Sequence, residues 1–346
     1  MPQPQCLLEK RFRSTSRWPF CGTAMNHQPF SLGVNYPWSR YAEDFGGSAA
    51  GHRGISLREN AAGVAENFAG IRECGASVVR WFLFGDGRSG FVTEKGIPQR
   101  PDQFLFRDVR TALELAGRLD LKLCFSLIDY LWLQDRTGQP AVHENERVLQ
   151  FAAGREAFLQ RVLIPMFREF RGHPALFAWE IANEPEWAIR EFNPQPTAKM
   201  HFADFRCFAE EIVQAAHESA GVRVTLGSAR LDWARAWVEL GLDFYQAHYY
   251  PGHDSRHRSG LAQHLAALPE FDKPLWLGEL PARDDANPSY SLEASLNHCW
   301  DAELFGAAIW RWTPPEKAGS DLQHGRVDPA VLRAWNLAER SQKASA

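Results

Sequence analysis

Residues 176–185 read LFAWEIANEP, a nearly continuous apolar run that ends abruptly in Asn183, Glu184 and Pro185. An apolar run of this length, without a polar face, is typical of a strand covered on both sides, as in a parallel sheet. We therefore predict a buried strand over Leu176–Ala182, with polar side chains gathered where it ends.

The same pattern recurs along the chain after residue 30. Further strand-like runs occupy Phe30–Asn35, Ala76–Phe84, Leu121–Ile128, Arg223–Gly227, Phe244–His248, Pro274–Gly278 and Gly306–Trp310. Between them lie helical patterns at Leu57–Glu73, Asp102–Leu119, Asn145–Arg171, Phe202–Ser219, Leu231–Leu240, Leu261–Leu268 and Ser291–Glu303, and one more follows at Asp328–Glu339. Strands that alternate with helices pair in parallel, because a parallel connection needs a crossover of about a dozen residues or more.

This succession of strand–helix units favours a closed barrel over an open sheet. An open dinucleotide-binding sheet usually carries GxGxxG after its first strand, and none follows Phe30–Asn35. The 346 residues would suit two domains by length alone, but α/β barrels run this long as one. We predict an α/β fold, a (β/α)8 TIM barrel, as a single domain over residues 30–346, with residues 1–29 as a poorly ordered N-terminal extension.

Charge and composition narrow the classes of partner. The 38 Lys and Arg nearly balance the 42 Asp and Glu, so nothing favours a nucleic acid or an anionic membrane as partner. The six cysteines form no CxxC pair, which favours a reduced protein over a disulfide framework. No secretory apolar stretch lies near the N-terminus. We expect a cytoplasmic location, with export as the alternative if the true start differs, for example at Met25.

Polar and aromatic residues follow most of the predicted strands. They are Asn35-Tyr36-Pro37-Trp38, Arg80 with Asp86, Asp129-Tyr130-Leu131-Trp132, Asn183-Glu184-Pro185-Glu186-Trp187, His248-Tyr249-Tyr250, Glu279 and Trp310-Arg311-Trp312. In an α/β barrel the chemistry lies at these C-terminal strand ends. Each residue taken singly has a structural explanation, but together they bring two carboxylates, an arginine and several aromatic rings to one face.

Two carboxyl groups on one face suit the hydrolysis of a glycosidic bond. One carboxyl group must keep a proton for the leaving oxygen while the other stays ionised, and different surroundings can hold the two pKa values apart. Tryptophan rings stack on sugar faces, and Trp38, Trp132 and Trp310 are our candidates for this role. This chemistry requires no cofactor and no metal, and we see no metal-ligand spacing.

The motifs at these strand ends resemble those of clan A glycoside hydrolases, particularly family 5. The Asn183-Glu184-Pro185 triplet, Glu279, His248-x-Tyr250, Arg80 and Trp310 match the family's pattern in the correct strand order. The resemblance covers nearly everything after residue 30. It implies that Glu184 is the general acid/base and Glu279 the nucleophile of a retaining enzyme.

The resemblance also implies roles for the other matched residues. Arg80 would keep Glu279 ionised, Tyr250 would orient it, and His248 would position neighbouring groups or a sugar hydroxyl. Asn183 would bind the sugar 2-hydroxyl, which requires a twist or bulge because adjacent strand residues point to opposite faces. The family's eighth-strand tryptophan often precedes a cis peptide bond, so we predict one at Trp310–Arg311.

The chain departs from the family at the end of the third strand. Many members carry a histidine where this chain reads Asp129-Tyr130-Leu131-Trp132, and this stretch is more similar to the β-mannanase branch. We interpret Glu180 as a supporting residue and Glu186 as a loop charge. The favoured function is hydrolysis of β-linked, manno- or gluco-configured and β-1,4-linked oligo- or polysaccharides. A transglycosylase and a catalytically inactive carbohydrate-binding barrel stay open as alternatives.

Overall fold

The computed structural model describes residues 30–135, 143–251, 260–268, 271–284, 287, 289–312 and 325–345. The predicted extension over residues 1–29 lies outside this range, and the cytoplasmic location stays a prediction. Within the described residues, no helix is both long enough and apolar enough to span a membrane.

A closed parallel barrel forms the centre of the molecule, so the predicted (β/α)8 fold is confirmed. Its strands, in the order in which they pair, are β1 (Ser31–Asn35), β12 (Gly306–Trp310), β11 (Leu275–Pro281), β10 (Tyr245–His248), β9 (Val224–Ser228), β8 (Leu176–Asn183), β7 (Lys122–Asp129) and β4 (Val78–Phe82). The ring closes because β1 pairs with β12 on one side, Ser31 opposite Gly306, and with β4 on the other. Each of the predicted runs overlaps one of these strands, and the largest difference is at β11, which extends three residues beyond the predicted end at Gly278.

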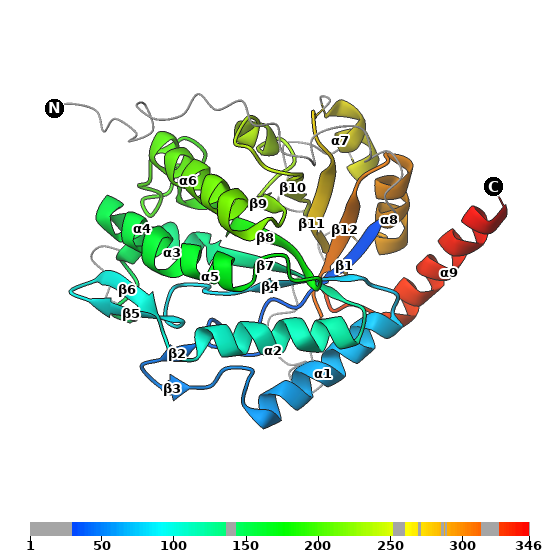
Figure 1. Cartoon of the computed structure of the whole chain (residues 1–346). Coiled ribbons are helices and arrows are strands. Elements are labelled where there is room, and N and C mark those ends of the chain that lie inside the picture. Colours follow the sequence, from blue (N-terminus) through cyan, green and yellow to red (C-terminus); the bar gives the residue numbers. More distant parts are fainter. Residues whose placement is uncertain are drawn as a thin grey trace.

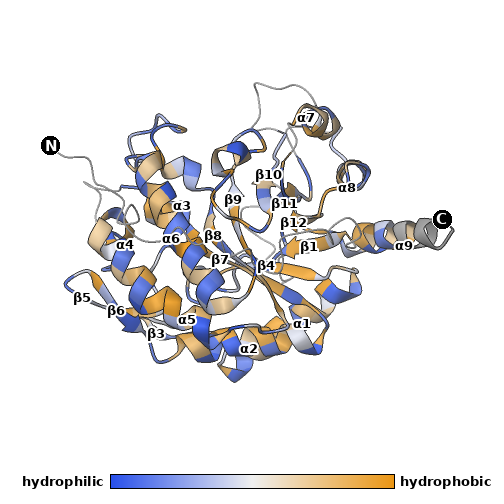
Figure 2. Ribbon diagram, turned by 45° about the horizontal axis from the view of Figure 1, so that its top comes forward, coloured by the Kyte–Doolittle hydropathy of each residue, from blue (hydrophilic) through white to orange (hydrophobic). Residues whose placement is uncertain are grey.

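Helices surround the barrel, as Figure 1 shows. The longer ones are α1 (Arg58–Glu73), α2 (Leu105–Arg118), α6 (Phe202–Ala220), α8 (Leu292–Asp301) and α9 (Pro329–Ser345). The shorter ones are α3 (Tyr130–Leu133), α4 (Ala152–Phe158), α5 (Ile164–Glu169) and α7 (Leu261–Ala267). Figure 2 shows apolar residues concentrated on the strands and on the inner sides of the helices, as burial of the strands on both faces requires.

Two helix predictions differ from the structure. The pattern at Asn145–Arg171 is divided into η2 (Val148–Gln150), α4, a π-helical segment η3 (Leu159–Leu163) and α5. The pattern at Leu231–Leu240 yields only the short 3-10 helix η5 (Ala234–Trp237). In both cases the apolar spacing is right, but the hydrogen-bond pattern changes inside the segment, which spacing alone does not reveal.

Two small hairpins were not predicted. One joins β2 (Gly47–Ser48) to β3 (Gly51–His52), and the other joins β5 (Phe91–Glu94) to β6 (Ile97–Pro101). In the second, Lys95 and Gly96 both have positive φ, 52° and 75°, which is the geometry of a tight hairpin turn. The hairpins extend the connections that follow β1 and β4 at the C-terminal end of the barrel.

The barrel interior changes from apolar to polar along the strands. Val78, Cys124 and Ala178 belong to a buried apolar cluster that also contains Trp276. Two residues further along the same strands, and so on the same inward face, come Arg80, Ser126 and Glu180. The apolar layer therefore supports a polar layer directly beneath the mouth of the barrel.

The free cysteines Cys74, Cys124 and Cys299 are buried. These three thiols form no disulfide, as the reduced protein expected from the sequence requires, and Cys6 and Cys21 lie outside the described residues.

Candidate active site

Glu184 follows β8 in a left-handed backbone conformation, with φ 49° and ψ 46°. Its N–H donates a hydrogen bond to the carbonyl of Gly227 on β9, and the β8–β9 register shifts between Glu180 and Asn183. The strand thus bends where Asn183 gives way to Glu184. This bend is the irregularity expected from the sequence, and it lets both neighbours serve the same site.

Glu279 lies within β11, where the pairing with β10 and β12 is irregular. Its Oε1 accepts a hydrogen bond from Arg80 Nη1 at 2.6 Å, and its Oε2 accepts one from the Tyr250 hydroxyl at 2.6 Å. A guanidinium and a hydroxyl therefore hold the two oxygens of Glu279 separately, which fixes the plane of the carboxylate.

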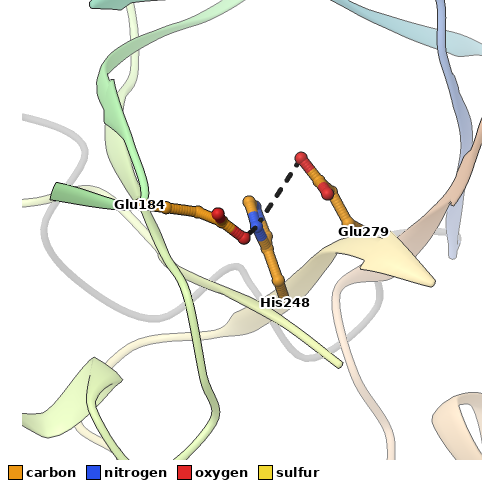
Figure 3. Close-up of side chains that lie close together, drawn as sticks. All are labelled: Glu184, His248 and Glu279. Carbon is orange, nitrogen blue, oxygen red and sulfur yellow. Dashed lines mark hydrogen bonds and ion pairs between the residues drawn. The ribbon is translucent and has the colours of Figure 1, made fainter. Parts of the chain in front are cut away.

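The two carboxylates face each other across His248, as Figure 3 shows. Glu184 and Glu279 each place a carboxylate oxygen within 4.8 Å of the other, and a ring nitrogen of His248 lies within the same distance of both. His248 Nδ1 lies 2.8 Å from Glu184 Oε1 and 3.6 Å from Glu279 Oε1. Residues from β8, β10 and β11 thus meet at one point, as the sequence predicted.

Burial sets the charge of the histidine. Desolvation lowers the pKa of His248 to about 4, so the ring is neutral near pH 7. A neutral ring has one N–H, and Nδ1 is the nitrogen in hydrogen-bond contact with Glu184, so Nδ1–H donates to Glu184 when that group is ionised. His248 therefore contributes no positive charge to the site.

The two carboxylates have different surroundings. Desolvation raises the pKa of Glu184 to about 7, and the hydrogen bond from Trp187 Nε1 at 2.9 Å opposes this rise only in part. Desolvation also raises the pKa of Glu279, but Arg80 and the Tyr250 hydroxyl stabilise its ionised form. Glu184 is the carboxyl group better suited to hold a proton at neutral pH, because Arg80 forms an ion pair with Glu279 and, among the described residues, no guanidinium forms one with Glu184.

Arg80 connects Glu279 to the layer beneath. Its side chain is fully buried, and each of its five N–H groups has an acceptor. Nε and Nη2 donate to the two oxygens of Glu180, both at 2.6 Å, and the remaining hydrogens go to Asn35, Asn183 and Glu279.

Glu180 also accepts from Ser126 and Gln246, so two donors hold each of its oxygens. Arg80 overcomes the cost of burial and lowers the pKa of Glu180. This is the supporting position interpreted from the sequence.

An aromatic wall borders the site. Trp310 and Trp38 lie edge to face with ring centroids 6.2 Å apart, and both remain partly exposed. The peptide bond between Trp310 and Arg311 is cis, which confirms the prediction. Partly exposed rings of this kind can stack on a sugar.

Two interpretations from the sequence are wrong. Trp132 is fully buried against Phe91 and Phe158, and its Nε1 donates to a backbone carbonyl, so it has no free face for a sugar. Glu186 is no loop charge: it is fully buried and accepts hydrogen bonds from the Ser228 hydroxyl, the Ala229 N–H and Trp237 Nε1. These hydrogen bonds hold the turn after Glu184 against the residues that end and follow β9.

Two residues of the site were not singled out from the sequence. Trp187 holds the second oxygen of Glu184, and Asp129, the last residue of β7, accepts a hydrogen bond from Asn183 Nδ2 at 3.2 Å. Their position at strand ends was visible, but their contacts depend on the turn at Glu184 and on the register between β7 and β8.

Within the described residues, Glu184, His248 and Glu279 are also the one acidic or histidine group whose atoms lie close enough to hold a metal ion. The hydrogen bonds described above already explain why these three side chains lie close together. A separate hollow of about 420 Å³ lies between the two hairpins and the region of Glu144, and none of the three residues lines it.

Comparison with known proteins finds similarity to enzymes that act on β-linked mannans. No family model matches the chain. Mannan endo-1,4-β-mannosidase from Mytilus edulis is 25% identical to it, over 90% of this chain and 91% of the relative. The structure is similar to a β-1,4-D-mannanase from Cryptopygus antarcticus, with a TM-score of 0.69, 17% identity and 89% of each chain covered. It is also similar to a GH5_18 protein from Streptomyces cattleya, with a TM-score of 0.63, 17% identity, and 92% and 81% of the two chains covered.

The chain resembles the family 5 glycoside hydrolases, as its similarity to a mannan endo-1,4-β-mannosidase and to a GH5_18 structure supports. The residues that match the family 5 pattern meet at the mouth of the barrel: Arg80, Asn183, Glu184, His248, Tyr250 and Glu279. Asp129 ends β7, the third barrel strand in chain order, where the resemblance would often place a histidine.

Proposed function

We propose that the protein is a retaining endo-β-1,4-mannan hydrolase. The single observation that carries the proposal is the carboxylate pair, whose oxygens approach within 4.8 Å across the mouth of a (β/α)8 barrel. Retaining glycosidases place their two carboxyl groups about 5–5.5 Å apart, whereas inverting enzymes leave about 6.5–9.5 Å for a water molecule. The names of the relatives supply the choice of mannan and of endo action.

The reaction assigns one role to each carboxyl group. Glu279, held by Arg80 and Tyr250, attacks the anomeric carbon and forms a glycosyl ester. Glu184, whose pKa is raised to about 7, gives its proton to the leaving oxygen as the glycosidic bond breaks. Glu184 then takes a proton from a water molecule that attacks the ester, which releases the sugar with its original configuration and restores both groups.

The surrounding residues support these steps. The neutral His248 and Trp187 Nε1 each donate a hydrogen bond to Glu184, so they orient the acid without adding charge to it. Asn183 is held by Arg80 beside the pair, in position for a sugar hydroxyl. Trp310 and Trp38 offer ring faces to the sugars of the chain.

Hydrolysis of β-1,4-mannan, together with a panel of aryl β-glycosides, tests the proposal. We expect wild-type protein to release oligosaccharides from mannan and Glu279→Ala to lose activity by about 10⁴-fold or more, as losses of a covalent nucleophile do. Added azide should restore turnover in Glu279→Ala and give the α-glycosyl azide, since azide replaces the carboxylate from the same side. Glu114→Ala, on the outer surface of α2, is the matched control and should keep full activity.

Other outcomes would point to the alternatives. Turnover only in the presence of an acceptor sugar would make the protein a transglycosylase. Binding of manno-oligosaccharides without turnover would identify a carbohydrate-binding barrel. Products of inverted configuration from the wild type would contradict the retaining mechanism.

A further inference from the structure

Asp129 is a third carboxylate at the mouth of the barrel, and the reaction as derived does not use it. It is the last residue of β7 and lies in register with Asn183, the last residue of β8. Its Oδ1 accepts a hydrogen bond from the N–H of Leu131 at 2.8 Å, and its Oδ2 accepts one from Asn183 Nδ2 at 3.2 Å. The first contact caps the short helix α3, and the second reaches into the site.

The contact with Asn183 fixes the orientation of an amide. Asn183 Oδ1 accepts from Arg80 Nη2 at 2.8 Å, while its Nδ2 donates to Asp129. A flipped amide would place two donors face to face at Arg80 and two acceptors face to face at Asp129. One hydrogen of Nδ2 is used in the bond to Asp129, so the other remains to donate to a ligand.

Asp129 also keeps acceptor capacity of its own. A carboxylate offers about four acceptor sites. Glu180 receives four hydrogen bonds and is fully buried, whereas Asp129 receives two from the described side chains and backbone and stays 7% exposed. A partly exposed acceptor therefore lies beside the free hydrogen of the Asn183 amide.

Among the described residues, no cation forms an ion pair with Asp129. The pKa of Asp129 is raised to about 7, mainly by burial and further by the charges of Glu184 and Glu279, while the hydrogen bonds from Leu131 and Asn183 oppose the rise. Tyr41 and Tyr130 also face it, and its charge contributes to the raised pKa of each hydroxyl. Such a group gains from a hydroxyl donor that enters with the substrate.

We propose that Asp129 is a specificity-determining residue that, together with Asn183, binds the 2-hydroxyl of the sugar attached to the scissile bond. The hydroxyl oxygen accepts the free Nδ2 hydrogen of Asn183, and the hydroxyl hydrogen is donated to Asp129. The Asn183 half of this contact is what family 5 resemblance implies, and the acceptor half is inferred from the position of Asp129. The inference rests on the proposed function, because it needs a β-glycoside bound between Glu184 and Glu279.

A cycle of variants and substrates tests the pair. The substrates are an aryl β-mannobioside and its analogue that lacks the 2-hydroxyl on the sugar next to the aryl group. A hydrogen bond to a charged group is worth about 1.5–3 kcal/mol, so Asp129→Ala should lower kcat/KM on the parent substrate by about 10- to 150-fold. On the deoxy analogue the same variant should cost little, so the parent-to-deoxy ratio should shrink by about tenfold or more.

Asp129→Asn separates this role from folding. Asparagine also caps helices, so the variant keeps the cap of α3 while it removes the charge. We expect the parent-to-deoxy ratio of this variant to fall between those of wild type and Asp129→Ala, with a melting temperature no lower than that of wild type. Asp120→Asn, at a surface ion pair with Arg72, is the matched control and should leave the ratio as in wild type.

An equal loss on both substrates in Asp129→Ala would overturn the inference, since a structural role does not depend on one hydroxyl. Failure of the proposed function has another signature: wild-type protein would hydrolyse neither substrate. The affinities of mannobiose and of 2-deoxy mannobiose for wild type and Asp129→Asn then decide the inference by themselves. If the variant discriminates between the two as well as wild type does, the inference is wrong.

Discussion

Glu180 and Glu184 lie four residues apart at the end of β8, and their environments have opposite effects. The Glu180 side chain is fully buried, yet its pKa is lowered because two hydrogen bonds from Arg80 stabilise its charge. The Glu184 side chain is 15% exposed, yet its pKa is raised to about 7. The more buried carboxyl group is thus the one that stays ionised.

The difference shows that hydrogen-bond and ion-pair partners determine whether each of these carboxyl groups is ionised, more than the depth of its burial does. Glu180 belongs to the polar layer inside the barrel, where two donors hold each oxygen. Glu184 belongs to the mouth, where its donors are the neutral groups of Trp187 and His248. The polar layer inside the barrel therefore holds groups that stay charged. The mouth of the barrel holds a carboxyl group that can gain and lose a proton.

Within this comparison of Glu180 and Glu184, removing the Glu184 carboxyl group gives the largest expected effect. Glu184→Gln should lower kcat/KM on mannan by about 10²–10⁴-fold, the usual contribution of a general acid. The loss should be much smaller for aryl glycosides with good leaving groups, because these need little protonation. A uniform loss on all leaving groups would show that Glu184 does not protonate the leaving oxygen.

Removing Arg80 from the polar layer inside the barrel should lower the stability of the fold. Arg80→Ala leaves Glu180 as an uncompensated buried charge, so we expect a loss of about 3–5 kcal/mol in the free energy of unfolding, measured with denaturant. The matched variant Arg72→Ala breaks a pair with Asp120 that is largely exposed, and should cost about 0–1 kcal/mol. Equal losses in the two variants would contradict the contrast between buried framework and surface.

The raised pKa of Glu184 predicts a cost in stability at alkaline pH. Since the pKa is about 7 in the fold and about 4.3 in an unfolded chain, this carboxyl group contributes stability that is fully present below about pH 4 and is lost as pH rises through about 7. Glu184→Gln should therefore be more stable than wild type at pH 8, by about 3 kcal/mol at most, and not at pH 4. Thermal unfolding at both values measures this, and a gain at both would be inconsistent with the titration of Glu184.

The smallest expected effect concerns Trp187. Its N–H lowers the pKa of Glu184, so Trp187→Phe should raise that pKa further and move the alkaline limb of kcat/KM, which lies near pH 7 in wild type, to higher pH. We expect a shift of about one pH unit, the scale of a single hydrogen bond to a charged group. Trp233→Phe, a neighbouring ring that packs edge-on against Trp187, is the control and should leave the limb in place.

Sequence patterns located every strand of the barrel and most of the site, because both depend on features that a sequence displays directly. Long apolar runs mark strands buried on both faces, and the strand ends carry Glu184, Glu279, Arg80 and His248. The cis bond at Trp310 was also foreseen, from family resemblance.

The errors arose where a contact depends on local geometry. The left-handed turn at Glu184 redirects the chain. The Glu186 side chain therefore points inward and bonds to Ser228 and Trp237, where the sequence suggested contact with solvent. Trp132 packs inside an aromatic cluster because α3 begins directly after Asp129 and returns the chain to the core. Neither turn has a sequence signal as clear as an apolar run.

The five hydrogen bonds of Arg80 also constrain how the chain can fold. Its two carboxylate partners lie 100 and 199 residues further along the chain. During synthesis Arg80 leaves the ribosome long before either carboxylate exists, and a guanidinium without partners stays in water. The inward-facing side chains of β4 can therefore reach their native packing only after β8 and β11 have been synthesised. Closure of the barrel is thus a late step that depends on non-local contacts, and the appearance of enzymatic activity would report it.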